Sequence, residues 1–122
     1  MPYAYRKSER LKKNSDFTAV MKGKRLSFDG LSLFYADNEI GTFRVGISVG
    51  KKLAKAAKRN RLRRQIRTSI MKALEQYSLG YDLVFVARRE LLYADYDRIR
   101  KAVENILLRS VLRTRRRESA NP

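Results

Sequence analysis

The residues of this chain with the clearest capacity for chemistry on a partner are cations, and they are concentrated in one segment. Residues 51–72 contain ten Lys or Arg and no Asp or Glu. A guanidinium forms paired hydrogen bonds to phosphate and stacks on exposed bases, while an ammonium adds a mobile point charge. The segment is therefore typical of a surface that binds a polyanion. Its cations are Lys51, Lys52, Lys55, Lys58, Arg59, Arg61, Arg63, Arg64, Arg67 and Lys72.

The composition argues against most catalytic and metal-binding arrangements. The chain has 122 residues with no Cys and no His, so thiol and imidazole nucleophiles, bases and metal ligands are absent. We find no obvious carboxylate cluster for paired metals, and we assign no catalytic and no metal-ligating residue. No apolar run approaches the ~20 residues of a membrane helix, and the charged N-terminus is not followed by a signal-peptide core. We expect a cytoplasmic protein with no membrane partner and no protein partner.

The balance of charge and apolar residues predicts one compact basic domain. Lys and Arg number 29 against 12 Asp and Glu, giving a formal net charge of +17, and 43% of residues are hydrophobic. Such a chain can bury a core, and its default partner is RNA, DNA or, less often, an anionic membrane. We predict a single RNA-binding domain over residues 1–122, with an extended basic arm at 1–13 and a basic tail at 113–122.

Hydrophobic periodicity predicts an α+β sandwich with three helices and a small central mixed β-sheet of about four strands, in the order α-β-β-β-α-β-α. Asn14 or Ser15 is expected to cap the first helix and Asp95 the last. Gly30 is expected to divide an apolar stretch into two strand pieces. The expected elements are a first helix ending near Gly23, strands within 26–36, at 43–49 and at 83–87, a basic helix at 55–77, and a final helix after Asp95.

The basic helix combines a core-facing stripe with a charged outer face. At about 100° per residue, its apolar residues share one side. Asn60, Arg61, Arg64 and Arg67 fall broadly on the opposite side, and Arg59 and Arg63 flank the stripe. Lys51 and Lys52 precede the helix N-terminus, which itself attracts phosphate. This pattern predicts a nucleic-acid-binding helix strongly, and RNA rather than DNA only weakly. The apolar stripe comprises Leu62, Ile66, Ile70, Ala73, Leu74 and Tyr77.

The segment around this helix closely resembles the signature of the protein subunit of bacterial ribonuclease P. The resemblance is carried by SVGKKLAKAAKRNRLRRQIR at residues 48–67, by RLKKNSDFTAVMKG at 10–23 and by FRVGISV at 43–49. With LVFVAR and the final helix it spans about residues 9–112. It implies a subunit of an endoribonuclease that removes the 5′ leader of precursor tRNA. In that family the RNA subunit performs the hydrolysis with Mg²⁺, and the protein assists. The family is also known for a left-handed β-α-β crossover, which the resemblance predicts here.

The resemblance also assigns two sets of binding residues. A cleft that holds the precursor-tRNA leader is implied for Phe17, Met21 and Tyr35, where Met21 departs from a frequent family Phe. Core packing under a helix is the alternative for Phe17 and Met21, and a half-buried sheet tyrosine for Tyr35. Binding of the RNA subunit is implied for Lys51, Lys52, Arg59, Asn60, Arg61, Arg63, Arg64 and Arg67.

Two further departures and two other functions remain open at this point. The family usually has Gly-Asn where this chain has Ala54-Lys55, and often Ser at Gly50, so this loop is expected to contact RNA differently. A ribosomal or RNA-chaperone protein explains the charge, the size and the missing catalytic residues equally well. A DNA-binding module with this helix in the major groove is weaker, because the helix is expected to pack along its length on a sheet.

Overall fold

The structure of the protein is a computed structural model. It describes residues 10–11, 14–77 and 79–112, and for residues 14–16 it describes the backbone only. The basic tail and most of the expected arm therefore lie outside the described residues, as do the side chains expected to cap the first helix. Arg10 and Leu11 continue the arm into the fold. Arg10 forms a parallel bridge with Val45, and the Leu11 amide donates to the Val45 carbonyl at 3.1 Å. Both residues thus pair with Val45, and the extended arm over residues 1–13 stays a prediction.

The described elements follow the expected order, with one short addition. In the described part of the chain, three α-helices and four strands alternate as α-β-β-β-α-β-α, which confirms the predicted fold class. A 3₁₀ helix between the last strand and the last helix was not expected. The elements are α1 (Asn14–Met21), β1 (Lys24–Phe28), β2 (Leu31–Asp37), β3 (Arg44–Val49), α2 (Ala56–Leu74), β4 (Tyr81–Ala87), η2 (Arg89–Tyr93) and α3 (Tyr96–Leu108).

The four strands form one mixed sheet in the order β1-β2-β4-β3. β1 and β2 form an antiparallel hairpin, and both residues of its two-residue turn have positive φ, 48° at Asp29 and 84° at Gly30. Such a turn matches the twist of the strands, which explains why Gly30 separates two strands. β2 is antiparallel to β4, and β3 is parallel to β4. β3, α2 and β4 therefore form a β-α-β unit, whose left-handed crossover stays a prediction from the resemblance.

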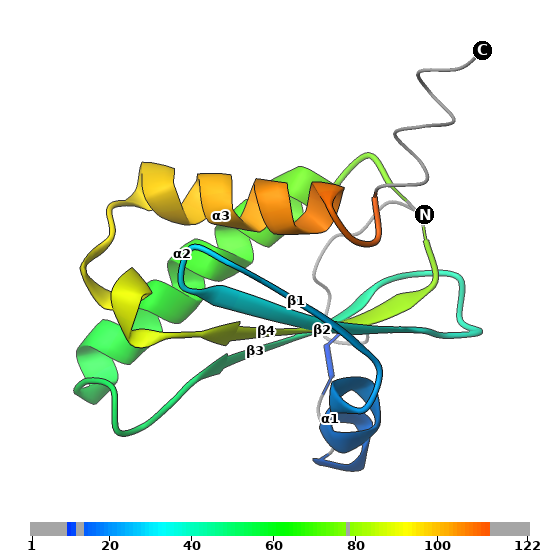
Figure 1. Ribbon diagram of the computed structural model, residues 1–122, viewed down its shortest axis with the longest axis horizontal. Coiled ribbons are helices and arrows are strands. Elements are labelled where there is room, and N and C mark those ends of the chain that lie inside the picture. The colour runs from blue at the N-terminus through cyan, green and yellow to red at the C-terminus, as the bar shows by residue number, and fades with distance from the viewer. Residues whose placement is uncertain (1–9, 12–13, 78, 113–122) are drawn as a thin grey trace.

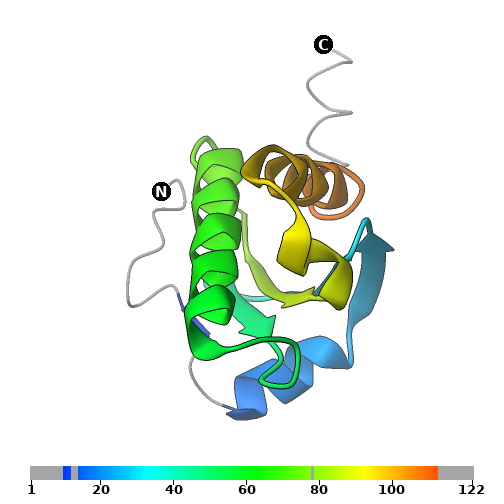
Figure 2. The same cartoon turned by 90° about the vertical axis from the view of Figure 1, so that its left-hand side faces the viewer.

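The sheet carries helices on both faces. Figures 1 and 2 show α2 and α3 together on one face and α1 on the other. Since side chains alternate along a strand, Leu33 and Phe85 point into the main core under α2 and α3, and Phe34 and Val84 point toward α1. The expected stripe of α2 is buried at Leu62, Ile66, Ile70 and Leu74, and half-buried at Ala73 and Tyr77.

Two boundaries and one additional element differ from the sequence expectation. α2 ends at Leu74 rather than near Tyr77, because the Tyr77 amide turns back to the Leu74 carbonyl at 2.9 Å. β4 begins at Tyr81, two residues before the apolar run. η2 is too short to show helical periodicity in the sequence. Asp95 caps α3 as predicted, since its carboxylate accepts from the Arg98 amide at 2.9 Å.

A buried carboxylate fixes the ends of β3 and β4. Asp82 accepts from Arg44 at 2.8 Å on Oδ1 and at 2.7 Å on Oδ2, and Asn38 donates to Oδ1 at 2.8 Å. Arg44 and Asp82 are also partners in the parallel register. The paired and hydrogen-bonded charges hold the strands in the alignment that places Gly46 beside Val84.

Candidate nucleic-acid interface

The first candidate surface is the start of α2 with the loop before it. The N-cap residue Lys55 makes no side-chain hydrogen bond to the helix, and the first turn contains no acidic residue. The positive end of the helix is thus neither capped by a side chain nor neutralised within its own first turn. Lys51 and Lys52 are exposed directly before it, as the sequence predicted. Helix amides and ammonium groups together favour a phosphate at this position.

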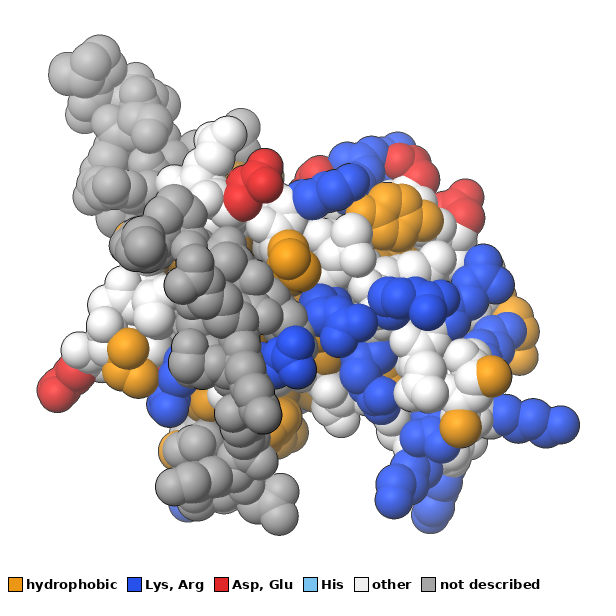
Figure 3. Space-filling view, turned by 180° about the vertical axis from the view of Figure 1, so that it is seen from behind, with side chains coloured by type: hydrophobic (Ala, Val, Ile, Leu, Met, Phe, Trp, Pro, Cys, Tyr) orange, Lys and Arg blue, Asp and Glu red, His pale blue; other side chains and the backbone are white. Residues whose placement is uncertain are grey.

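The charged face of α2 is close to the expected one but is not uniform. Asn60, Arg61 and Arg64 are exposed, whereas Arg67 is half-buried although it was expected to point away from the core. Arg59 and Arg63, expected at the flanks, are also half-buried. Figure 3 shows Lys and Arg side chains gathered across this side of the molecule. The structure therefore brings the predicted basic residues onto one continuous side of α2 and its preceding loop.

Two of these side chains, Arg59 and Arg63, also form hydrogen bonds within the protein. The Arg59 Nε donates to the Ala54 carbonyl at 3.1 Å, which ties the loop after β3 to the first turns of α2. Arg63 Nη1 donates to the Asn60 Oδ1 at 3.0 Å. The Asn60 oxygen is thus engaged within the protein, and its amide NH₂ is the group better placed to meet an RNA acceptor.

The neighbouring helix α3 has the opposite arrangement of charge. Arg100 pairs with Asp97 at 2.6 Å and with Glu104 at 2.9 Å, and Lys101 pairs with Asp97 at 3.0 Å. The hydrogen bond from Arg100, and then that from Lys101, lowers the pKa of Asp97 below its ordinary value. Arg100 and Lys101 of α3 are therefore compensated by carboxylates one turn away, while residues 51–72 contain no carboxylate.

The second candidate surface lies where α1 packs on the sheet. Phe17 is half-buried, and its ring lies over Gly46 of β3, where a Cβ would meet the ring Cζ at 2.5 Å. Phe34 and Val86 pack against the same small cluster, which is built around Leu11, Val20 and Val84. Met21, at the end of α1, is 46% exposed. Partly exposed aromatic and apolar side chains therefore lie around the edge of this cluster.

The structure does not bring Tyr35 to this cleft, so the expected grouping of Phe17, Met21 and Tyr35 is corrected. Tyr35 pairs with Leu83 in the sheet and packs on the main core, on the face opposite α1. Phe34 occupies the α1 face instead. The guanidinium of Arg25 lies 5.5 Å from the centroid of its ring. The alternation of Leu31 and Leu33 as core residues was the sequence signal that should have selected position 34.

Tyr35 lines a separate cavity of about 440 Å³ beyond the end of α3. Tyr81 and Arg109 line it as well. Burial, followed by the charge of Asp37, raises the pKa of the Tyr81 hydroxyl above its ordinary value. The Tyr81 phenol therefore stays protonated to a higher pH than an unperturbed tyrosine.

The acidic residues that the structure describes give no geometry for a bound metal ion. Across residues 10–11, 14–77 and 79–112, no group of three His, Cys, Asp or Glu side chains is arranged to hold one. Within the same residues, no helix combines the length and apolar character needed to cross a membrane.

Comparison with known proteins gives one consistent result. The model of the family described as Ribonuclease P matches residues 5–111. A ribonuclease P protein component of Thermoanaerobacter sp. (strain X514) is 32% identical over 108 residues, covering 88% of this chain and 93% of the relative. That of Bacillus cereus (strain Q1) is 35% identical over 107 residues, covering 86% and 93%. The structure of a Staphylococcus aureus RNase P protein mutant with defective mRNA degradation activity superposes with a TM-score of 0.80 at 32% identity, covering 86% of this chain and 90% of that one.

Proposed function

This chain belongs to the ribonuclease P protein family, and we propose that it assists precursor-tRNA cleavage by binding two RNAs on separate surfaces. It is the protein subunit of an endoribonuclease that processes the 5′ end of tRNA. A ribosomal or RNA-chaperone role is not favoured by these relatives.

The α2 surface is proposed to bind the catalytic RNA subunit. The observation that carries this assignment is the run of ten cations without an acid at residues 51–72, displayed on α2 and its preceding loop. Lys51 and Lys52 would meet phosphates near the helix N-terminus. Arg61 and Arg64 would meet the backbone along the exposed side. Neutralising phosphates releases counterions, so this binding should be steeply dependent on salt.

The cleft beside α1 is proposed to hold the single-stranded 5′ leader of precursor tRNA. Phe17 and Phe34 offer rings on which successive bases can stack, and stacking tolerates differences in base sequence. Met21 adds an apolar contact that is more flexible than the Phe ring frequent at this position in the family. Arg25 beside Phe34 supplies a cation for the leader backbone. This arrangement suits leaders of varied sequence.

The hydrolysis itself is proposed to take place on the RNA subunit, with Mg²⁺ bound there. The contribution of this chain is to bind RNA, to reduce repulsion between the two RNAs and so to lower the Mg²⁺ needed. We place this activity in the cytoplasm.

Reconstitution tests this function. The purified protein is mixed with a bacterial ribonuclease P RNA and a 5′-labelled precursor tRNA at low Mg²⁺. We expect the leader to be released when the protein and the ribonuclease P RNA are both present. Little release is expected with the protein alone or with the RNA alone. A variant with Arg59, Arg61, Arg64 and Arg67 all changed to Gln should fail to stimulate cleavage at moderate salt. Equal stimulation by that variant would contradict the assignment of α2.

A further inference from the structure

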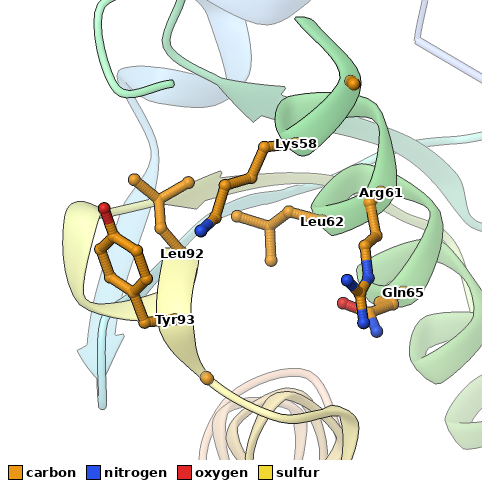
Figure 4. Close-up of a pocket in the computed structure, with 8 residues that line it drawn as sticks. Lys58, Arg61, Leu62, Gln65, Leu92 and Tyr93 are labelled. Atoms are coloured by element: carbon orange, nitrogen blue, oxygen red, sulfur yellow. The ribbon is translucent and has the colours of Figure 1, made fainter. Parts of the chain in front are cut away.

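A cavity of about 510 Å³ lies between α2 and η2, beside the cationic side chains of α2. Its size is within the range of small-molecule sites, which is about 300–1,000 Å³. Figure 4 shows the side chains of α2 facing those of η2 across it. Its principal lining residues are Lys58, Arg61, Leu62, Gln65, Leu92 and Tyr93.

The lining combines three kinds of group that a nucleotide requires. Leu62 and Leu92 are buried and give the cavity an apolar wall. Lys58 and Arg61 bring positive charge to it, and none of the described residues that line it is acidic. Gln65 adds an amide that can both donate and accept a hydrogen bond. The charges favour an anionic ligand, and the apolar wall favours a ligand with a flat or aromatic part.

Tyr93 is the most exposed of the large hydrophobic side chains at this cavity. It is 81% exposed, and the Lys58 ammonium lies 3.8 Å from the centroid of its ring. Such an exposed ring makes little contribution to the core. It is, however, well placed for stacking, and the cation over it can move to a phosphate without disturbing the fold.

We propose that this cavity binds one unpaired nucleotide of the RNA subunit, with its base stacked on Tyr93. Lys58 and Arg61 would bind the flanking phosphates, and Gln65 would form a hydrogen bond with the base edge. A paired base has both faces covered by its neighbours in the helix, so only a looped or bulged nucleotide fits. The inference rests on the proposed binding of the RNA subunit by α2, because Lys58 and Arg61 belong to that helix.

Filter binding of the RNA subunit to full-length protein variants tests the inference. The variants are Tyr93→Ala, which removes the ring, and Tyr93→Phe, which keeps the ring and removes the hydroxyl. Ile40→Ala is the matched control, because Ile40 is a large exposed apolar side chain in the β2–β3 loop, outside both proposed surfaces. Each dissociation constant is measured over a range of salt, and thermal unfolding confirms that each variant is folded.

We expect Tyr93→Ala to bind about 5- to 150-fold more weakly, which corresponds to the roughly 1–3 kcal/mol found for loss of one base–aromatic stack. Tyr93→Phe and Ile40→Ala should bind like the unchanged protein. The salt dependence should not change for Tyr93→Ala, because no phosphate contact is removed. Hydroxyl-radical footprinting should then show one unpaired RNA position that the unchanged protein and Tyr93→Phe protect, and Tyr93→Ala does not.

Two results would overturn the inference alone, and a third would also contradict the proposed function. If Tyr93→Ala binds as well as Ile40→Ala, no base stacks on the ring. If Tyr93→Phe loses as much affinity as Tyr93→Ala, the hydroxyl rather than the ring is recognised. If the unchanged protein gives neither tight binding of the RNA subunit nor a footprint from α2, the proposed function itself fails, and the inference fails with it.

Discussion

The Phe17 ring of α1 rests on the backbone of Gly46 in β3, at a place where a side-chain carbon would lie 2.5 Å from the ring Cζ. A separation this short excludes even a methyl group unless the ring moves. Gly46 therefore leaves the space that the Phe17 ring occupies against β3, and so helps to position the ring proposed to stack on the leader. The absence of a side chain at one position of β3 thus shapes the cleft formed with α1.

The variant Gly46→Ala should move Phe17 and disturb both stability and leader binding. Forcing a methyl group into a closely packed contact costs about 1–3 kcal/mol of unfolding free energy. Gly50→Ala is the matched control, because a Cβ there would meet Leu53 at an ordinary 3.7 Å. Urea unfolding should show a clear loss for Gly46→Ala and a change within about 0.5 kcal/mol for Gly50→Ala. Equal stability of the two variants would contradict the close packing of Phe17 on Gly46.

The placement of Phe34 and Tyr35 on opposite faces of β2 gives a direct test of the cleft. Phe34→Leu and Tyr35→Leu each replace a ring with an apolar side chain. We expect Phe34→Leu to weaken binding of precursor tRNA with a leader by about 1–3 kcal/mol, the range found for loss of one stacked base. Tyr35→Leu should leave leader binding unchanged. The measurement is the affinity of the holoenzyme for precursor tRNA with and without its leader. A larger loss of leader binding for Tyr35→Leu than for Phe34→Leu would show that Tyr35, rather than Phe34, contacts the leader.

The salt dependence of RNA binding should separate α2 from α3. Arg64→Gln should reduce the slope of log affinity against log salt by about 0.7–0.9, corresponding to one lost phosphate contact. Arg100→Gln changes the net charge equally. Arg100 is paired with Asp97 and Glu104 on α3, outside the proposed surfaces, so its slope should be unchanged. Equal reductions for the two variants would indicate that only net charge matters.

The turn between β1 and β2 should make a pH-dependent contribution to stability. Arg98 donates to Asp29 at 2.8 Å and 3.1 Å, and this hydrogen bonding, opposed only in part by burial, lowers the pKa of Asp29 below 3.8. A lowered folded-state pKa stabilises the protein above the unfolded value, and the effect is lost as pH falls through the folded one.

The variant that tests this turn is Asp29→Asn, which keeps a residue tolerant of positive φ and removes the charge. It should unfold at a slightly lower urea concentration than the unchanged protein near pH 6. The difference between the two should shrink as the pH is lowered below 3.8. A difference that stays constant from pH 6 to pH 3 would assign the effect to the turn conformation rather than to the ion pair.

Several features of this protein could be predicted from the sequence because they depend on local pattern. The spacing of Leu62, Ile66 and Ile70 fixes which side of α2 faces the core, and so which side carries the cations. Asp95 lies where a side-chain oxygen can accept from the third residue of α3. The acid-free run at residues 51–72 predicts a polyanion-binding surface wherever the helix is placed in the fold.

Other features depend on contacts between segments that are distant in the sequence. The cleft needs α1 to meet β3 and β2, so Phe34 rather than Tyr35 joins Phe17 once the pleat of β2 and its pairing with β4 are fixed. The α2–η2 cavity arises only because a five-residue 3₁₀ helix places Tyr93 opposite Lys58. Periodicity reports which face of one element is buried, and only the tertiary structure decides which side chains of two elements meet across a gap.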